Sequence, residues 1–338
     1  MQVTMGGILT QLFPPSPKFT DNNLPSLVGK VFIVTSANSG VGFEVAKILY
    51  CKGGTVYIAG RSPTKVAAAI EAIRTTSNEG PGYIKSLYLD LSDLSTISTC
   101  VSSFLAQETR LDVLWNNAGI GQSPAGSVSV QGHEAHMGTN CLGPFLLTKL
   151  LLPIFVQTAK SSPRGSVRVI FTSSGLVDMK APEGGVSLTE LAPDNLSKDV
   201  VRNYSASKAG NWFLASEFDK RIRKEGIVCV TQNPGNLRTS GWTSDRIPWA
   251  ARKFFSPVLH EPKFGAYTEL WVGLSEDVKC EDGGRFAIPW GRWHPSPRAD
   301  IIQSLKTKEE GGTGLAAEFW GWCEERTKEF AGNRSAGQ

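Results

Sequence analysis

The stretch KVFIVTSANSGVGFEVAKILYC, residues 30–51, contains the pattern that decides the fold. Residues 30–36 are apolar and rich in β-branched side chains, which is typical of a short, fully buried strand in a parallel sheet. A turn of small residues follows, and residues 43–51 have the apolar spacing of an amphipathic helix. A strand, a glycine turn and a helix in this order provide backbone N–H groups and a helix N-terminus that can hold a pyrophosphate.

The same alternation of strands and helices continues along the chain. We expect strands at residues 55–59, 83–89, 111–115, 167–172, 227–231 and 285–288, and helices after Pro63 and within residues 94–107, 131–156, 204–224 and 314–330. Strands that alternate with helices predict a parallel sheet covered on both faces. Because no clear linker divides the chain, we expect one doubly wound α/β domain.

The predicted organisation has three parts: an N-terminal arm at residues 1–26, the main domain at residues 27–290, and a C-terminal extension at residues 291–338 with a closing helix. Within the main domain, residues 239–284 carry many aromatic side chains among proline and glycine. This composition predicts an irregular substrate loop with an apolar pocket. Packing of these aromatic side chains against the sheet is the alternative.

Composition limits the classes of function. The 338 residues are 41% hydrophobic and 20% charged, with 35 basic and 31 acidic side chains and a net charge of +4. No long block of like charge is present, so no nucleic-acid surface is indicated. The six cysteines lack metal-ligand spacing, which favours reduced thiols in a reducing compartment and no disulfide or zinc site.

The N-terminus shows neither a signal peptide nor a membrane-spanning segment. Its apolar piece, residues 6–13, is too short to cross a bilayer. We therefore expect a cytoplasmic protein with no transmembrane segment. The arm is predicted to pack on the domain surface, and a peripheral membrane contact through Ile8, Leu9, Leu12 and Phe13 is the alternative.

Tyr204 and Lys208 lie four residues apart in the run NYSASKAGNWF, residues 203–213. Residues at this spacing share one face of a helix. The Lys208 ammonium would favour the phenolate of Tyr204, whose unperturbed pKa is about 10, so the tyrosine would exchange protons near neutral pH. Taken alone, the spacing also fits an incidental pair on a surface helix.

In chain order, these features resemble the short-chain dehydrogenase/reductase family, over about residues 27–288. The family turn TGxxxGxG corresponds to residues 35–42, with Ser36 where the first glycine usually stands. The resemblance implies a Rossmann-type fold and a turn that contacts the dinucleotide through Ser36, Asn38, Ser39, Gly40, Val41 and Gly42. Ser36 departs from the family pattern, because a glycine there eases the tight turn.

The resemblance also implies the choice of cofactor. In this family an acidic residue after the second strand favours NAD, but this chain has Arg61 there, with Lys65 one turn later. A guanidinium suits a 2′-phosphate, which favours NADP(H). The other cofactor-binding residues implied by the resemblance are Asp90 and Leu91 at the adenine, Asn117, Ala118 and Gly119 in the NNAG sequence, and Pro234, Gly235 and Thr239 near the nicotinamide, together with Tyr204 and Lys208.

The catalytic residues implied by the resemblance are Asn140, Ser174, Tyr204 and Lys208. Tyr204 would be the general acid in carbonyl reduction, and the base in the reverse oxidation. Ser174 would bond the same substrate oxygen, with Ser173 as the alternative serine. Lys208 would lower the pKa of Tyr204 and bind the nicotinamide ribose, and Asn140 would hold a water that links Lys208 to solvent.

The long spacing between Ser174 and Tyr204 resembles retinol-dehydrogenase-like and fungal secondary-metabolite reductases. The resemblance implies an NADPH-dependent ketoreductase, or the reverse alcohol dehydrogenase, acting on a hydrophobic carbonyl compound such as a fungal polyketide or terpenoid intermediate. The alternatives are a non-catalytic dinucleotide-binding sensor or partner protein, and a non-redox isomerase or cyclase. Family members are often dimers or tetramers, which implies an interface formed by the Tyr204 and Asn140 helices.

Two histidines, His133 and His136, are three residues apart near the start of a predicted helix. This spacing can suit a metal, but no acidic or cysteine partner with ligand spacing accompanies them. We therefore expect surface or capping roles and no metal site.

Overall fold

A single mixed sheet organises the molecule. The computed structural model describes residues 5–77, 80–121, 123–192, 195–238 and 258–331. Within these ranges, eight strands form one sheet in the order β3-β2-β1-β4-β5-β6-β7-β8. The strands are β1 Val31–Thr35, β2 Thr55–Gly60, β3 Tyr83–Tyr88, β4 Val113–Asn116, β5 Val167–Thr172, β6 Ile227–Gln232, β7 Phe286–Ile288 and β8 Arg292–Trp293. All neighbouring pairs are parallel except the antiparallel pair β7 and β8, which confirms the predicted doubly wound sheet.

Strand β1 marks the point where the winding of the sheet reverses. It pairs with β2 on one side and with β4 on the other. In doubly wound sheets, ligands bind beyond the carboxyl ends of the strands at this switch point. The predicted glycine turn lies there, between the end of β1 at Thr35 and the start of helix α2, Gly40–Cys51.

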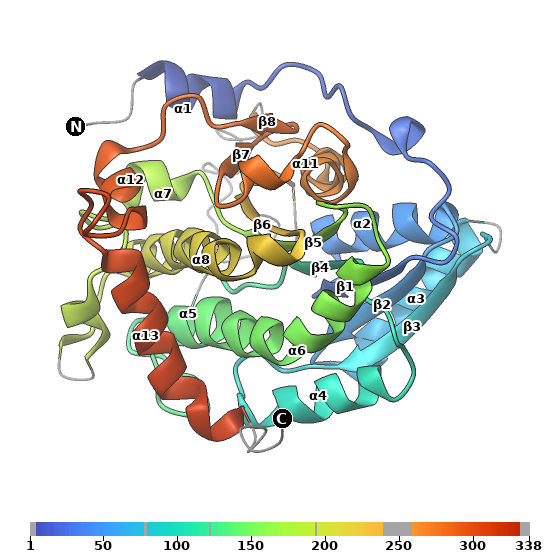
Figure 1. The fold of residues 1–338 in the computed structure, drawn as a ribbon, viewed down its shortest axis with the longest axis horizontal. Coiled ribbons are helices and arrows are strands. Elements are labelled where there is room, and N and C mark those ends of the chain that lie inside the picture. Colours follow the sequence, from blue (N-terminus) through green and yellow to red (C-terminus); the bar gives the residue numbers. More distant parts are fainter. Residues whose placement is uncertain (1–4, 78–79, 122, 193–194, 239–257, 332–338) are drawn as a thin grey trace.

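Helices cover both faces of the sheet (Figure 1). One face carries α2, α3 (Pro63–Thr76) and α11 (Pro262–Leu274), and the other carries α4 (Ser95–Leu105), α6 (Gly143–Lys160) and α8 (Val200–Ile222). Each face has its own apolar cluster, with Phe32 fully buried in the first and Phe155 in the second. The predicted strands and long helices are therefore confirmed to within a few residues at their ends.

The helical run that contains Asn140 is long and apolar. It comprises α5 (Ala135–Met137), a π-helical turn (Gly138–Leu142) and α6. By length and composition alone residues 135–160 are apolar enough to cross a membrane, but 67% of the most apolar window is buried inside the fold. This is the pattern of a core helix that packs between a sheet and a further layer.

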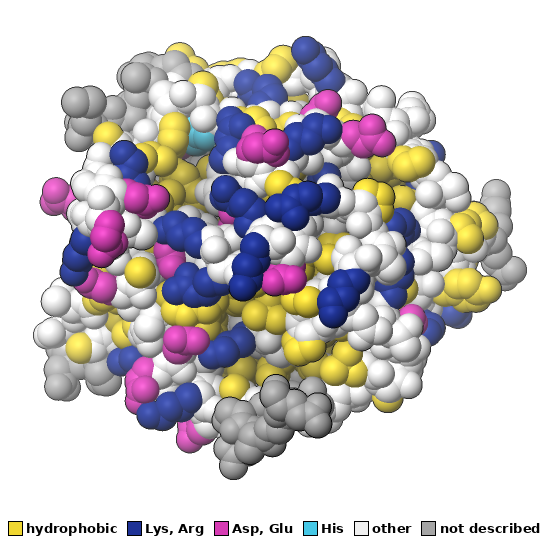
Figure 2. Space-filling model, in the orientation of Figure 1, with side chains coloured by type: hydrophobic (Ala, Val, Ile, Leu, Met, Phe, Trp, Pro, Cys, Tyr) yellow, Lys and Arg dark blue, Asp and Glu magenta, His cyan; other side chains and the backbone are white. Residues whose placement is uncertain are grey.

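The C-terminal helix α13, Leu315–Thr327, forms that further layer. It crosses α8 and α6 on the side away from the sheet (Figure 1). Trp320 lies with its ring centroid 4.8 Å from that of Phe145 and 4.6 Å from that of Phe218. On the face seen in the orientation of Figure 1, basic side chains lie among acidic and apolar ones (Figure 2). Helix α13 covers part of the surface of α6 and α8, where we expect a subunit interface. The predicted oligomer stays a prediction.

Two segments differ from the expected irregular chain. The N-terminal arm contains a short helix, α1 (Met5–Leu12), and the segment predicted to be a loop contains α11. Tyr267 and Trp271 of α11 are buried in the core cluster of the first face, so for this part of residues 239–284 the predicted irregular loop is wrong and packing against the sheet is correct. The apolar residues there outline a helix face that the glycine and proline content obscures.

Candidate active site

The turn after β1 is built from one strained residue and a tight helix start. Ser36 has φ of 55°, in the left-handed region, and is the one non-glycine residue with positive φ among those the structure describes. An L-residue in this conformation costs roughly 1–2 kcal/mol, which explains the usual preference for glycine at this position. Gly40 also has positive φ, at 61°. The turn thus places a serine in a left-handed conformation that glycine adopts without strain.

The helix that starts at Gly40 approaches the neighbouring strand closely. A Cβ added at Gly42 would lie 2.6 Å from Nδ2 of Asn117. That Nδ2 atom donates a hydrogen bond to the Thr35 carbonyl at 2.8 Å, and the Ala118 N–H donates to Oγ1 of Thr35 at 2.8 Å. The NNAG segment therefore fixes the end of β1, and Gly42 is small because no side chain fits there.

A cavity of about 220 Å³ opens beside this turn. It brings together eight of the predicted cofactor-binding residues, namely Ser36, Asn38, Arg61, Lys65, Asp90, Leu91, Ala118 and Gly119. Asp90 accepts hydrogen bonds from the N–H and hydroxyl of Ser92, at 2.9 Å and 2.6 Å, which hold its carboxylate at the cavity wall. Arg61 lines the cavity and is exposed, and the next residue, Ser62, caps α3 by accepting from the Lys65 N–H at 3.4 Å.

Tyr204 and Ser174 meet beyond the end of β5. Tyr204 lies in the second turn of α8, and the nearby Ser174 hydroxyl by itself would lower the pKa of the tyrosine. Burial has the larger effect and raises the pKa of Tyr204 above its ordinary value of 10.0. The expected lowering of this pKa by Lys208 is therefore wrong here, because the low-polarity surroundings penalise the phenolate. Tyr204 holds its proton at neutral pH.

Lys208 is buried behind the tyrosine, with a side chain 4% exposed. Its Nζ atom donates to the Thr172 carbonyl at 2.9 Å and lies 5.7 Å from the centre of the Tyr204 ring. Burial lowers the pKa of Lys208 to about 8. A Cβ at Gly119 would come within 2.9 Å of the same Nζ, so the ammonium lies directly beside the NNAG turn.

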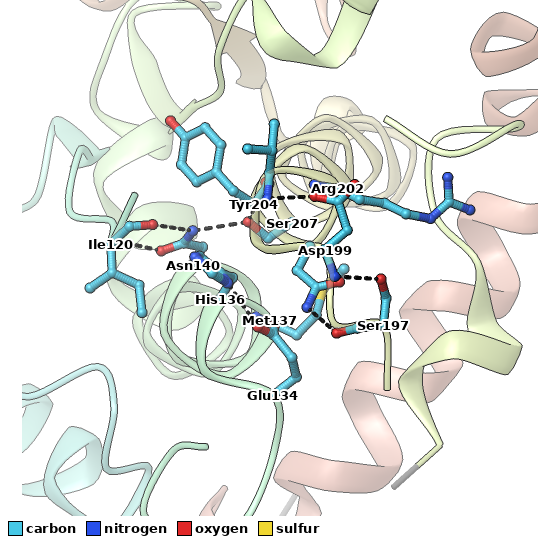
Figure 3. A network of polar contacts seen from close by, with 12 residues as sticks. Ile120, Glu134, His136, Met137, Asn140, Ser197, Asp199, Arg202, Tyr204 and Ser207 are labelled. Carbon is cyan, nitrogen blue, oxygen red and sulfur yellow. Dashed lines mark hydrogen bonds and ion pairs between the residues drawn. The ribbon is translucent and has the colours of Figure 1, made fainter. Parts of the chain in front are cut away.

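Asn140 occupies the π-helical turn and is fully buried. Its Oδ1 accepts from the Ile120 N–H at 2.8 Å, while its Nδ2 donates to the Ile120 carbonyl at 3.1 Å and to Oγ of Ser207 at 2.9 Å (Figure 3). π-Helical turns are frequent at functional sites. The asparagine thus joins the chain after the NNAG turn to α8, one residue before Lys208.

The two adjacent serines at the end of β5 have different surroundings. Ser173 is buried and donates to the Lys208 carbonyl at 2.8 Å, so its hydroxyl is committed to holding α8. Ser174 accepts the Leu176 N–H at 3.2 Å, and its hydroxyl is close enough to Tyr204 to influence the pKa of the tyrosine. This geometry favours Ser174 over Ser173 as the serine that meets a substrate.

Pro234 and Gly235 follow β6 at the same end of the sheet as Ser174. Gly235 has φ of 93°, and its N–H donates to Oδ1 of Asn233 at 3.0 Å. A Cβ at Gly235 would come within 2.9 Å of the Trp290 ring, so a side chain is excluded at this turn. The predicted contact at Thr239 lies outside the described residues.

Two further polar groups near the site were not predicted. His136 is buried rather than at the surface: its Nδ1 lies 2.7 Å from Glu134, and its ring meets that of Tyr204 edge-on at 6.0 Å (Figure 3). Glu269 of α11 is fully buried and accepts from Oγ1 of Thr172 at 2.9 Å. Burial raises the pKa of Glu269 to about 8. Glu134 caps α5 by accepting from the Met137 N–H, although glutamate is not a preferred N-cap residue.

No cluster of three or more potential metal ligands occurs in the part of the chain that the structure describes. The cysteines at positions 51, 100, 141, 229, 280 and 323 are all free thiols.

Comparison with known proteins agrees with this geometry. A family model described as short chain dehydrogenase matches residues 30–186. The short-chain dehydrogenase/reductase iacJ of Pestalotiopsis fici is 45% identical over 323 residues, which cover 94% of this chain and 96% of that protein. A short-chain dehydrogenase/reductase of Phomopsis amygdali is 44% identical, covering 95% of this chain and 96% of that protein.

The chain is a short-chain dehydrogenase/reductase.

Solved structures with a similar fold match this short-chain dehydrogenase/reductase over most of its length. The crystal structure of an uncharacterised protein from Mycobacterium paratuberculosis has a TM-score of 0.65 and 27% identity, and the match covers 93% of this chain and 98% of that one. The RhlG/NADP active-site complex of Pseudomonas aeruginosa matches with a TM-score of 0.62 and 24% identity over 80% of this chain and 98% of that one. The latter shows the shared fold alone.

Proposed function

We propose that this short-chain dehydrogenase/reductase is an NADPH-dependent reductase of a carbonyl group in a hydrophobic small molecule, and that it oxidises the corresponding alcohol in reverse. One observation carries the proposal. A protonated Tyr204, close to the Ser174 hydroxyl and backed by the buried Lys208, lies at the same end of the sheet as the cavity beside the glycine turn.

The residues divide the chemistry between them. When bound, the reduced nicotinamide supplies the hydride. Tyr204 acts as the general acid and gives its proton to the carbonyl oxygen, for which its raised pKa is suited because the proton is present at neutral pH. Ser174 donates to the same oxygen and orients it. Lys208, whose pKa is about 8, then returns a proton to Tyr204.

The side chains that line the cavity support a dinucleotide with a 2′-phosphate. Arg61 and Lys65 are the two basic residues that line it, next to the ribose end expected for this fold. The bare backbone at Gly42 leaves room for a pyrophosphate at the start of α2. These contacts support NADP(H) over NAD(H).

The catalytic proposal is tested with Tyr204→Phe. NADPH consumption, followed at the nicotinamide absorbance band with a panel of hydrophobic ketones, is expected to fall by at least about a hundredfold, while NADPH binding persists. Tyr88→Phe, at an exposed sheet-edge position, serves as the control. Full turnover by Tyr204→Phe would refute the mechanism. Conversion of a substrate without NADPH consumption would instead indicate an isomerase or cyclase, and binding without any turnover a sensor.

Cofactor choice is tested with Arg61→Ala. We expect the preference for NADPH over NADH to fall roughly tenfold or more, because a charge-assisted contact to the phosphate is lost. Arg74→Ala is the matched control, since Arg74 lies on α3, the helix that follows Arg61, and donates to the Ile84 carbonyl instead of lining the cavity. Unchanged discrimination in Arg61→Ala would remove Arg61 from this role.

The relatives from fungi support a substrate from fungal secondary metabolism, such as a polyketide or terpenoid ketone. With this assignment we propose a cytoplasmic enzyme whose main domain spans residues 27–290. The six free thiols fit a reducing compartment.

A further inference from the structure

The N-terminal helix α1 lies against the catalytic end of the sheet. Figure 1 shows α1 beside β8 and α7, Leu176–Lys180, which directly follows Ser174. Arg292 of β8 holds the helix by donating to Oγ1 and to the carbonyl of Thr10, both at 2.8 Å. One side chain of the helix, Gln11, points inward and is only 7% exposed. A buried amide of this kind needs defined partners.

The amide of Gln11 bonds two different loops. Its Nε2 donates to Oδ2 of Asp178 at 2.8 Å, and its Oε1 accepts from Nδ2 of Asn233 at 2.9 Å. Asp178 lies in the segment after β5, and Asn233 lies in the segment after β6. Gln11 is therefore a bridge between the chain that carries the catalytic serine and the chain that carries the Pro234-Gly235 turn.

The orientation of this bridge is determined by its partners. Asp178 also lies 2.8 Å from Nε2 of His294, and both side chains are at most 4% exposed. Nδ1 of His294 accepts the Ser296 N–H at 3.2 Å, so Nε2 carries the proton and donates to Asp178. A carboxylate that only accepts requires the NH₂ group of Gln11 to face it, which leaves Oε1 for Asn233.

Both ends of the bridge reach residues next to the reacting groups. Oδ1 of Asn233 accepts a hydrogen bond from the Gly235 N–H at 3.0 Å. A Cβ added at Gly175 would lie 3.0 Å from Nδ2 of Asn233 and 3.5 Å from Oε1 of Gln11. The two amides thus lie against the backbone that directly follows Ser174.

We propose that Gln11 is a positioning residue of the active site: through Asp178 and Asn233 it fixes the distance between the Ser174 segment and the Pro234-Gly235 turn. This inference rests on the proposed reductase function. In the proposed function Ser174 would orient the substrate oxygen and the turn after β6 would hold the nicotinamide, so the relative position of these two segments would set the approach of the two reactants. A misplacement of about 1 Å in such a geometry costs up to roughly a hundredfold in rate.

The test replaces the hydrogen-bond donor of Gln11 that faces Asp178 with an acceptor. Gln11→Glu sets a carboxylate against Asp178, and we expect kcat for ketone reduction to fall roughly tenfold. Adding Asp178→Asn to the same chain removes one of the two facing carboxylates and with it the charge repulsion. The double variant should therefore recover most of the lost kcat. Leu9→Ala, an exposed position on the same helix, is the control. The thermal midpoint of each variant, expected to stay within about 4 °C of the parent, separates positioning from loss of fold.

The outcomes separate this inference from the function on which it rests. Full kcat in Gln11→Glu, or no recovery in the double variant, would overturn the positioning role. If the parent protein reduces no ketone with NADPH, the proposed function fails, and the bridge is judged by amide hydrogen exchange of residues 174–180 and 233–235. Faster exchange in Gln11→Glu that the double variant reverses supports the bridge, and unchanged exchange overturns it.

Discussion

Helices α11 and α13 close opposite sides of the molecule with different chemistry. α11 lies directly on the sheet and carries Glu269 into the core, beneath the strand end that also receives Lys208. α13 lies one layer further out and packs through rings, with Phe319 fully buried. The helix next to the strand ends thus contributes a buried polar side chain near the site. The outer helix contributes stability and no side chain to the site.

The largest expected effect concerns α13. Phe319→Ala removes a ring that packs against Phe213, with centroids 6.0 Å apart, and leaves a cavity. We expect the free energy of unfolding to fall by about 3–5 kcal/mol, measured by urea denaturation. Ketone reduction by the folded fraction at low temperature should stay within about twofold of the parent, because no contact to the site is lost. A loss of kcat without a loss of stability would contradict the view that α13 contributes to stability alone.

A matched control on the same helix is Gly321→Ala. A Cβ at Gly321 would meet no atom within 4 Å. The substitution should therefore raise the free energy of unfolding by about 0.5–1 kcal/mol, because alanine loses less backbone entropy in a helix.

An intermediate effect, dependent on pH, is expected for α11. The pKa of Glu269 is about 8 in the fold, against 4.5 for the ordinary side chain, so the folded state binds more protons between these values. Stability from this group is present below pH 4.5 and is lost as pH rises to about 8. Glu269→Gln removes this titration. The decrease in the free energy of unfolding as pH rises should therefore be smaller in the variant than in the parent, by on the order of 3 kcal/mol.

The contribution of Glu269 to the pH dependence of stability can be distinguished from that of Lys208, and a control variant is available. The pKa of Lys208 is lowered from 10.5 to about 8, so its contribution changes in the opposite sense and above pH 8. Urea denaturation at pH 5, 6, 7 and 8 thus isolates Glu269. Glu324→Gln, with a side chain 45% exposed on α13, should leave the pH dependence unchanged. Equal slopes for the parent and Glu269→Gln would contradict the assignment.

The smallest effect is expected at the polar rim of α13. Lys149 of α6 and Glu324 form an ion pair of 2.8 Å with both side chains partly exposed. Glu324→Ala should lower the free energy of unfolding by less than about 1 kcal/mol, and high salt should remove most of this difference. A larger, salt-independent loss would show that α13 is held by charge as well as by rings.

Local sequence patterns were sufficient for most of the fold. Strand β1 and its turn are contiguous, so residues 30–51 predict them directly, and the position of Ser36 as a departure from glycine coincides with its positive φ. The doubly wound arrangement was expected from the alternation of strands and helices. Helix α11 was missed because glycine, proline and aromatic residues mask its periodicity, and the burial of Tyr267 and Trp271 depends on the sheet beneath them.

Long-range polar partners could not be read from the sequence. Gln11 lies 167 residues from Asp178 and 222 from Asn233, and no local pattern links them. The pKa of Tyr204 was predicted in the wrong direction, because the helical spacing to Lys208 is visible in the sequence but the burial that dominates is not. Burial, unlike spacing, is a property of the whole fold.

The position of α13 has a consequence for assembly. With α13 in place, the rings of Phe145, Phe213 and Phe218 are covered by residues of the same chain. A second copy that docked on α6 and α8 through these rings would first have to displace the helix. The chain therefore supplies, in one polypeptide, the apolar cover that a subunit would otherwise provide on this face.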